Sequence, residues 1–462
     1  MTIRLDVSGM LAQAVPQGAT SSQLKDLGPR LLLAHEEMLA IAGRGTLGFR
    51  ELERQSAERD RVIAWARAAA PRFDDIVVLG IGGSALGAVA LRSALLGRDW
   101  NALSREQRGG RARLHVLDNV DPRSVRAVLE TLPLGRTLFL VISKSGSTAE
   151  TMSQYLAVRE RLRAASLPLT EHLAFVTDPE VGVLRRIAAD EGIPAFEVPQ
   201  NVGGRFSVLT PVGMLPAALL GMDVDAIIAG AVAMRDRCAT GALRENPALA
   251  FAALQWNAHT HAGQGMHVLM PYSDALRDLA PWFVQLWAES LGKHTTGGRG
   301  KNVGPTPIAA VGATDQHAQV QLFMEGPADK TVTFIDVETH PDDLTIPRTN
   351  DIPAELAYLG GRSFAELLRA EAHATAGALA QMGRPTMTLR VTAADAWHLG
   401  GLIMMFELAT IYAGNLYGVN PLDQPGVELG KQLTYYQFGH PQWTAMRDVW
   451  ESLPASDADW VL

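Results

Sequence analysis

Short runs of apolar, mostly β-branched residues alternate with longer amphipathic stretches from about residue 75 of the chain onward. The short runs predict strands, and the stretches between them predict helices. In this first region we expect strands at 76–81, 114–117, 137–143, 173–177 and 195–198, and helices at 84–96, 122–132 and 147–163. Apolar strands this continuous, with helices between them, indicate a parallel sheet that is covered on both faces.

A second region of the same rhythm begins near residue 246. We expect strands at 266–270, 332–335 and 386–391, and helices at 247–262, 272–291, 365–382 and 393–417. A helix-rich stretch, 223–244, connects the two regions, and a polar, proline-containing loop spans 341–353. The pattern predicts an α/β fold with two domains. We place these domains at 71–235 and 236–440, with a helical N-terminal segment at 1–70 and a C-terminal segment at 441–462.

Composition narrows the classes of protein to which the chain can belong. Of its 462 residues, 47% are hydrophobic and 19% are charged, which excludes disorder over most of the length. The formal net charge of −8 argues against a general binder of nucleic acid or of anionic membranes. An apolar stretch at 206–222 is short for a membrane span and contains two prolines. We expect a soluble protein that binds neither nucleic acid nor membrane.

The chain has a single cysteine, Cys238, and its first residues lack the pattern of a signal peptide. One cysteine excludes an intramolecular disulfide and a zinc site built from several cysteines. No spacing of histidines or carboxylates suggests a metal site. We therefore expect a cytoplasmic protein without a metal.

A glycine-rich loop, Gly80-Ile-Gly-Gly-Ser84, closes the first expected strand and opens a helix. Glycines in such a place let the backbone approach a ligand, and the start of the helix offers unpaired N–H groups to an anion. With Ala85 the loop also fits a loose dinucleotide fingerprint, but Asp118 comes too late for the acidic residue that such a site needs. A tight turn between strand and helix explains the loop equally well.

Hydroxyl side chains and one lysine are concentrated at 143–151, where the third expected strand leads into a helix. They are Ser143, Lys144, Ser145, Ser147, Thr148 and Thr151. Part of this run has a structural explanation, because Ser147 and Glu150 have the spacing of a capping box. Capping does not require the other hydroxyls. Hydroxyl and backbone donors without an arginine favour binding of a phosphomonoester that must also be released.

Two charged residues have the surroundings that acid–base chemistry needs. Arg205 lies on a glycine-rich turn, where it is either solvated or placed to stabilise an oxyanion.

Gln285, Glu289 and Lys293 are spaced four apart on an expected helix. They form either a solvated stripe with a Glu–Lys pair or part of a site. Neighbouring tryptophans would desolvate Glu289 and raise its pKa, as a general base requires. His317 and Lys431 carry no such signal on their own.

Six segments, taken in this order, resemble the glucose-6-phosphate isomerase (phosphoglucose isomerase) family. They are residues 80–87, 143–151, 201–207, 287–293, 315–317 and 423–431. The resemblance implies two sugar-isomerase (SIS-type) three-layer αβα domains with mainly parallel sheets. It also implies a homodimer that works without metal or cofactor, with the active site at the subunit interface. The implied reaction is the isomerisation of glucose 6-phosphate to fructose 6-phosphate through a cis-enediol(ate).

Roles follow from the resemblance at the matching positions only. Glu289 is then the base, Arg205 stabilises the enediolate, and His317 (from the partner subunit) and Lys431 assist ring opening. The implied substrate-binding residues are Gly83, Ser84, Ser143, Lys144, Ser145, Thr148, Thr151, Gln285 and Gln424. These roles suit a reaction that moves a proton beside a carbonyl, because it needs a carboxylate and a fixed positive charge.

Three features depart from the family pattern. The chain is shorter than the longer members, Leu291 stands where many have Asn, and Pro425 stands where many have Trp. None of them removes a proposed catalytic side chain. Two other functions remain as alternatives: a sensor of sugar phosphates that lacks catalysis, and an isomerase of 2-amino sugar phosphates.

Overall fold

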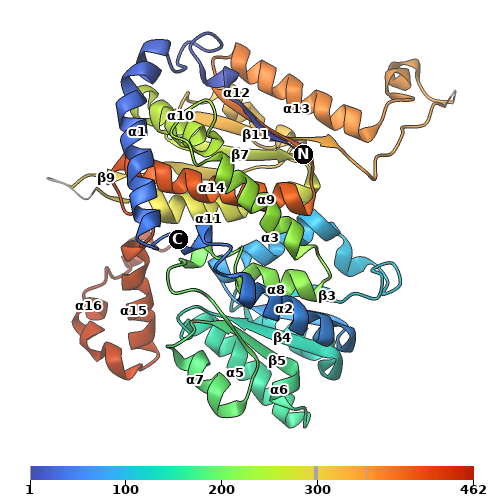
Figure 1. The fold of residues 1–462 in the computed structure, drawn as a ribbon, viewed down its shortest axis with the longest axis vertical. Coiled ribbons are helices and arrows are strands. Elements are labelled where there is room, and N and C mark those ends of the chain that lie inside the picture. Colours follow the sequence, from blue (N-terminus) through green and yellow to red (C-terminus); the bar gives the residue numbers. More distant parts are fainter. Residues whose placement is uncertain (1, 296–299, 350) are drawn as a thin grey trace.

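A computed structural model describes residues 2–295, 300–349 and 351–462, and over these residues the chain forms two five-stranded sheets and a two-stranded one (Figure 1). The first five-stranded sheet is parallel throughout and has the order β3-β2-β4-β5-β6. Its strands are β2 (Asp75–Leu79), β3 (Arg113–Leu117), β4 (Thr137–Ile142), β5 (Leu173–Thr177) and β6 (Ala195–Glu197). The parallel sheet expected from the continuous apolar runs is confirmed.

Helices cover both faces of this sheet, which gives three layers. In β2, Ile76 and Val78 belong to the large central core, whereas Val77 and Leu79 pack into a separate outer core. The outer core is closed by α4 (Pro122–Thr131), α5 (Ala149–Ala164) and α7 (Val183–Glu191). The inner face is covered by α2 (Ser56–Ala69), α3 (Leu86–Leu96) and α8 (Pro211–Leu219), and a short helix, α6 (Leu169–His172), precedes β5.

The second five-stranded sheet has the order β1-β12-β11-β7-β10, and only β1 is antiparallel to its neighbour. Its strands are β1 (Ile3–Asp6), β7 (Met266–Tyr272), β10 (Thr306–Ala309), β11 (Lys330–Thr339) and β12 (Thr386–Ala393). The sequence did not predict β1 and β10. Both are four-residue edge strands, too short for a period of two to stand out against a loop.

The second half supplies most of the remaining helices. They are α9 (Val224–Arg237), α10 (Pro247–Ala262), α11 (Leu279–Leu291), α12 (Val320–Glu325), α13 (Phe364–Gln381) and α14 (Ala396–Tyr417), with α1 (Ser21–Gly43) coming from the N-terminal segment. In the described part of the chain, α14 is the one helix long and apolar enough to cross a membrane. Its apolar window is 94% buried inside the protein, as expected of a core helix. It packs against α1, α9, α10 and α11.

The helix expected at 272–291 begins later than predicted. Tyr272 ends β7, a short 3-10 helix follows at Asp274–Leu276, and α11 starts at Leu279. Apolar residues of the 3-10 turn have nearly the spacing of an α-helix, so periodicity alone extends the helix too far. This difference matters because α11 carries Gln285 and Glu289.

Two segments extend from the body of the molecule. The last helices, α15 (Glu428–Gln437) and α16 (Arg447–Glu451), pack against each other and against a 3-10 helix at Pro441–Met446. Figure 1 shows them in red to one side of both sheets, and no residue from 422 to 462 is buried. A second arm, residues 340–349 and 351–363, projects between β11 and α13 (Figure 1, orange) and exposes Leu344 and Tyr358.

Candidate active site

The candidate site begins at the carboxyl ends of β2 and β4, which are neighbours in the first sheet. From β2 the chain crosses first to β3 on one side and then to β4 on the other, so the loops after β2 and β4 diverge at a switch point of the topology. Ligands of open parallel sheets bind at such points. A Cβ atom on Gly80, in the loop after β2, would lie 3.3 Å from the carbonyl oxygen of Ile142 at the end of β4.

The hydroxyl side chains after β4 converge. Thr148 Oγ1 lies 3.0 Å from Ser143 Oγ and 3.4 Å from Ser145 Oγ. Gly146 makes the turn possible with a φ of +64°, which favours glycine. Thr151 is buried on the first turn of α5, and its Oγ1 has no hydrogen-bond partner among the described residues. These four hydroxyls and the start of α5 form a set of donors suited to an anion.

The capping box expected from Ser147 and Glu150 is not formed. Helix α5 begins at Ala149 with Thr148 as its N-cap, so Ser147 lies outside the helix. The Ser147 N–H and hydroxyl instead donate to Ser145 Oγ, both over 3.3 Å. Because no side chain caps α5, the N–H groups of its first turn are not occupied by a capping side chain.

Lys144 fastens the hydroxyl loop to the next loop of the site. Its Nζ donates to the carbonyl oxygens of Gln200 and Val202 over 2.8 and 2.7 Å. Burial lowers the pKa of this ammonium, and the carboxylate of Asp178 opposes the shift. Because these two hydrogen bonds use two of its three N–H groups, Lys144 holds the loop that precedes Arg205 in place.

Gly82 and Gly83 bring the loop after β2 against the two elements that carry charged residues. A Cβ on Gly83 would lie 2.2 Å from the carbonyl oxygen of Gly204 and 2.8 Å from the backbone nitrogen of Arg205. A Cβ on Gly82 would lie 2.8 Å from Gln285 Nε2 on α11. Close approach to the backbone of Gly204 and Arg205 accounts for Gly83, and a φ of +56° favours glycine at Gly82. Ser84, at the end of the same 3-10 turn, lies half-buried beside them.

Arg205 is 3% exposed and uses all five of its N–H groups. Nε donates to Ser290 Oγ over 2.6 Å, and Nη1 donates to Glu289 Oε1 over 3.2 Å and to Gln424 Oε1 over 3.0 Å. Nη2 donates to the carbonyl oxygens of Pro421 and Asp423 over 2.6 and 2.8 Å. Burial lowers the pKa of the guanidinium, while Glu289 and Asp423 oppose that shift. The result is a positive charge that is fixed in position.

Glu289 is held between two donors. Its Oε1 accepts from Arg205, and its Oε2 accepts from Gln285 Nε2 over 3.0 Å. The side chain is 25% exposed, and it lines a pocket of about 430 Å³ together with Lys293, Asp423 and Gln424. The tryptophans of α11 are buried in the core. The hydrogen bonds of the carboxylate are with the guanidinium of Arg205 and the amide of Gln285.

Lys293 does not pair with Glu289. Helix α11 ends at Leu291, and Lys293 lies in the short strand β8 (Lys293–His294), which pairs with β9 (Asn302–Val303). Its Nζ donates to Asp423 Oδ1 over 2.7 Å and to the carbonyl oxygens of Asp423 and Asn420. The alternative of a solvated Glu–Lys stripe is therefore wrong.

Sequence reasoning gave no role to Ser290 and Asp423, and it left Lys293 as part of either a solvated stripe or a site; these three residues hold Arg205 and the pocket wall in place. Ser290 and Lys293 belong to the motif around Glu289, so their positions carried a signal. The carbonyl oxygens of Pro421 and Asp423 carry none, because every residue type offers the same backbone acceptor.

Two expected site residues, His317 and Lys431, form no hydrogen bond or ion pair with the described residues of this cluster within one chain. His317 is exposed at the end of a 3-10 helix, Thr314–His317, and makes no hydrogen bond or ion pair with the described residues. Lys431 lies on α15, where its Nζ contacts Glu428 Oε1 over 3.0 Å, and its side chain is 49% exposed. In the described part of the chain, no group of three His, Cys, Asp or Glu side chains is placed to hold a metal ion.

Comparisons with known proteins bear on the whole chain. A family model described as phosphoglucose isomerase matches residues 49–452. A glucose-6-phosphate isomerase of Rubrobacter xylanophilus is 43% identical over 93% of this chain and 97% of its own length. A solved structure of a hypothetical protein from Thermus thermophilus aligns with a TM-score of 0.85 and 38% identity over 95% of this chain and 100% of that one. The structure of a glucose-6-phosphate isomerase from Chlamydia trachomatis aligns with a TM-score of 0.72 and 25% identity over 86% of this chain and 77% of that one.

The fold expected from the six segments, with SIS-type αβα layers and mainly parallel sheets, is confirmed.

Proposed function

The chain belongs to the phosphoglucose isomerase family, and we propose that Glu289 is the base with which it works. Its reaction is the reversible isomerisation of glucose 6-phosphate to fructose 6-phosphate, a step of glycolysis and gluconeogenesis. One observation carries the assignment of the base. The Glu289 carboxylate is fixed beside a buried guanidinium, at the wall of a pocket formed with β8, β9 and residues 420–427. Gln285, which donates to this carboxylate, lies against Gly82 in the loop after β2.

The phosphate group of the substrate binds, in this proposal, to the hydroxyl loop after β4. Ser143, Ser145, Thr148 and Thr151 offer hydroxyl donors, and the uncapped start of α5 offers backbone N–H groups to the dianion. The unpartnered hydroxyl of Thr151 supports this role, because a buried donor without a partner is costly unless a ligand completes it. Gly83 and Ser84 then line the sugar between the phosphate and Glu289.

Proton transfer follows from the position of the carboxylate. In the open-chain aldose, Glu289 takes the proton from C2, because that carbon is next to the C1 carbonyl, and the electrons form a cis-enediolate with its charge on O1. Glu289 returns the proton to C1, and the hydroxyl proton passes from O2 to O1, which gives the ketose. Every bond broken is matched by one formed, so no oxidant, metal or cofactor enters the balance.

Arg205 stabilises the enediolate in this scheme. Its five N–H groups are occupied, so one of them must be released to reach the substrate oxygen. The N–H of Nη1 that donates to Gln424 is the one most easily released, because a side-chain amide rotates whereas the carbonyl oxygens of Pro421 and Asp423 are fixed by the backbone. Gln424 can then turn its amide to a substrate hydroxyl, which suits its expected contact with substrate.

The working unit is a cytoplasmic homodimer in this proposal, with each active site shared between two subunits. His317 and Lys431 support it, because they have the residue types needed for ring opening but do not meet Glu289 within one chain. The exposed apolar residues concentrated at 427–462 support it as well: Phe438 is 88% exposed and Trp460 is 80% exposed. Exposed patches of this kind are typical of surfaces that another subunit covers.

Deuterium incorporation tests the role of Glu289. Fructose 6-phosphate converted in deuterated water is expected to give glucose 6-phosphate with deuterium at C2, because a carboxylic acid exchanges its proton with solvent. Glu289→Gln is expected to bind the sugar phosphate normally and to lose about 10³-fold or more in kcat, since the amide cannot take up a proton. Glu160→Gln, which changes an exposed glutamate on α5, is the matched control. Near-normal turnover and exchange by Glu289→Gln would remove this residue from its role.

A further inference from the structure

A second pocket, of about 460 Å³, lies at the amino-terminal edge of the first sheet, on the side opposite to the active site. It is bounded by α2, by the loop of residues 103–111 that leads into β3, and by the turn between α8 and α9. Its position is fixed by Arg105, which lines the pocket and forms an ion pair with Asp74, the residue before β2. The reaction described above gives this pocket no role.

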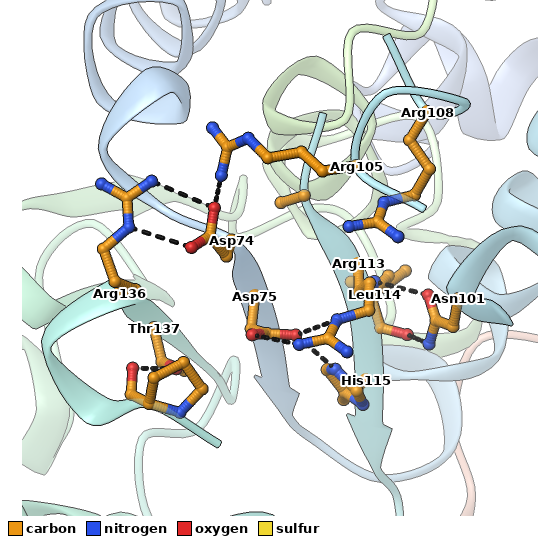
Figure 2. Close-up of polar contacts among 12 residues, drawn as sticks. Asp74, Asp75, Asn101, Arg105, Arg108, Arg113, Leu114, His115, Arg136 and Thr137 are labelled. Atoms are coloured by element: carbon orange, nitrogen blue, oxygen red, sulfur yellow. Dashed lines mark hydrogen bonds and ion pairs between the residues drawn. The ribbon is translucent and has the colours of Figure 1, made fainter. Parts of the chain in front are cut away.

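The charged side chains that line this pocket are all arginines: Arg67, Arg105 and Arg111. Two carboxylates of this edge, Asp74 and Asp75, are already engaged, as Figure 2 shows. Asp74 lies between Arg105 and Arg136, and the buried Asp75 contacts both Arg113 and His115 on the neighbouring strand β3. Among the described residues, Arg67 and Arg111 have neither a hydrogen bond nor an ion pair from their side chains. A chain with a net charge of −8 therefore holds a local excess of positive charge here.

The loop that carries Arg105 and Arg111 is held in one conformation by a third arginine. Arg108 is 6% exposed, and its Nε donates to the carbonyl oxygen of Arg111 over 3.1 Å while Nη1 donates to that of Leu103. The guanidinium of Arg111 packs over the turn after α8: a Cβ on Gly221 would lie 2.9 Å from Arg111 Nε. The backbone that carries Arg105 and Arg111 is thus held before any ligand arrives, which lowers the entropic cost of binding.

We propose that this pocket binds a nucleoside di- or triphosphate. Guanidinium groups form paired hydrogen bonds with phosphate oxygens, and three of them around one cavity suit a chain of phosphates better than a single one. The remainder of the pocket is apolar, with Ile63 from α2 and Leu219 and Met222 beside the turn after α8. A flat base can cover these side chains and stack on a guanidinium, and the volume is that of an ordinary small-molecule site.

Equilibrium dialysis against ATP tests the proposal, with saturating fructose 6-phosphate present so that the active site is filled. The wild-type protein is expected to bind one ATP per chain. The double variant Arg67→Gln/Arg111→Gln is expected to bind ATP about tenfold or more weakly, because two charge-assisted contacts are lost. The matched control is Arg123→Gln/Arg163→Gln, which removes the same charge from exposed arginines on α4 and α5. It is expected to bind like the wild type.

Inorganic pyrophosphate separates the two parts of the proposed ligand. It is expected to bind more weakly than ATP, because it cannot cover the apolar wall. Affinity equal to that of ATP would overturn the assignment to a nucleotide. Failure of the wild type to bind ATP, or equal binding by the Arg67→Gln/Arg111→Gln variant, would overturn the site itself. Isomerase activity is measured on each variant and is expected to be unchanged, so a failure here is independent of the proposed function.

Discussion

At the scale of single residues, Arg205 decides the character of the active site. It lies in the core, but each of its five donors has an acceptor, so burial does not leave an unpaired charge. Motif resemblance could predict that an arginine stands here. It could not predict that Pro421 and Asp423 hold it, because backbone acceptors leave no mark in the residue types.

Replacing Arg205 by lysine keeps the charge and removes the planar fork. Lysine has three donors for five acceptors, so at least two acceptors lose their partner. We expect kcat to fall about 100-fold or more and the free energy of unfolding to fall by about 1–3 kcal/mol. Steady-state kinetics and urea denaturation measure the two effects. Arg123→Lys, on the exposed face of α4, is the control, and wild-type kcat in Arg205→Lys would contradict the role given to the fork.

Glu407 is a second buried ionisable residue and, unlike Arg205, it has no hydrogen-bond partner for its side chain among the described residues. It is fully buried on α14, both of its carboxyl oxygens lack a hydrogen-bond partner in the described part of the chain, and burial raises its pKa well above the ordinary value. A raised pKa in the folded state means that folding favours the protonated form. The free energy of unfolding is therefore highest, as far as this residue is concerned, below the unfolded pKa of about 4.3. It decreases as the pH rises toward the folded pKa.

Glu407→Gln is expected to stabilise the protein more at pH 8 than at pH 5, because glutamine needs no proton to remain neutral. The gain in Tm relative to wild type should differ by about 2 °C or more between these two values of pH. Thermal denaturation followed by circular dichroism at both values measures it. Glu160→Gln on the surface should show no such difference. An equal shift at both pH values would mean that Glu407 titrates normally.

At the scale of elements, the core strands and long helices could be predicted, whereas the ends that carry the site could not. The strands of the first sheet lie where continuous apolar runs placed them, because a parallel sheet is buried on both faces. The predicted starts of α5 and α11 were wrong by two and seven residues. Local signals competed there: Ser147 had the type and spacing of a cap, and a 3-10 turn imitated the period of a helix. Tertiary contacts, which the sequence does not display, decided both.

The contact between the glycine loop and the turn at Gly204–Phe206 tests how far the elements depend on each other. A Cβ on Gly83 would fall 2.2 Å from a backbone atom of Gly204, so Gly83→Ala must push the Arg205 turn away. We expect a loss of about 1–3 kcal/mol in the free energy of unfolding and a larger proportional loss in kcat than in phosphate binding. Gly204→Ala is the matched control, because a Cβ there meets nothing within 4 Å. Equal behaviour of the two variants would show that the close approach is not required.

At the scale of the whole molecule, one chain forms most but not all of the proposed site. Arg205, Gln285, Glu289 and Gln424 are joined by hydrogen bonds, whereas His317 stands alone and Lys431 lies on a helix outside the body of the chain. Neither composition nor periodicity could predict this division, because both describe a single chain. Only the resemblance to the family led to the prediction that a second subunit completes the site.

Mixing two inactive variants tests that division directly. If His317 acts on the site of the partner, a dimer of one Glu289→Gln chain and one His317→Ala chain contains one site with both residues intact and one with neither. Unfolding the two variants together and refolding them at equal amounts should therefore recover up to about one quarter of wild-type activity, since half of the dimers are mixed and each has one working site. Each variant refolded alone is the control. If His317 serves Glu289 of its own chain, every site in the mixture lacks one of the two residues, and activity stays at the level of the separate variants.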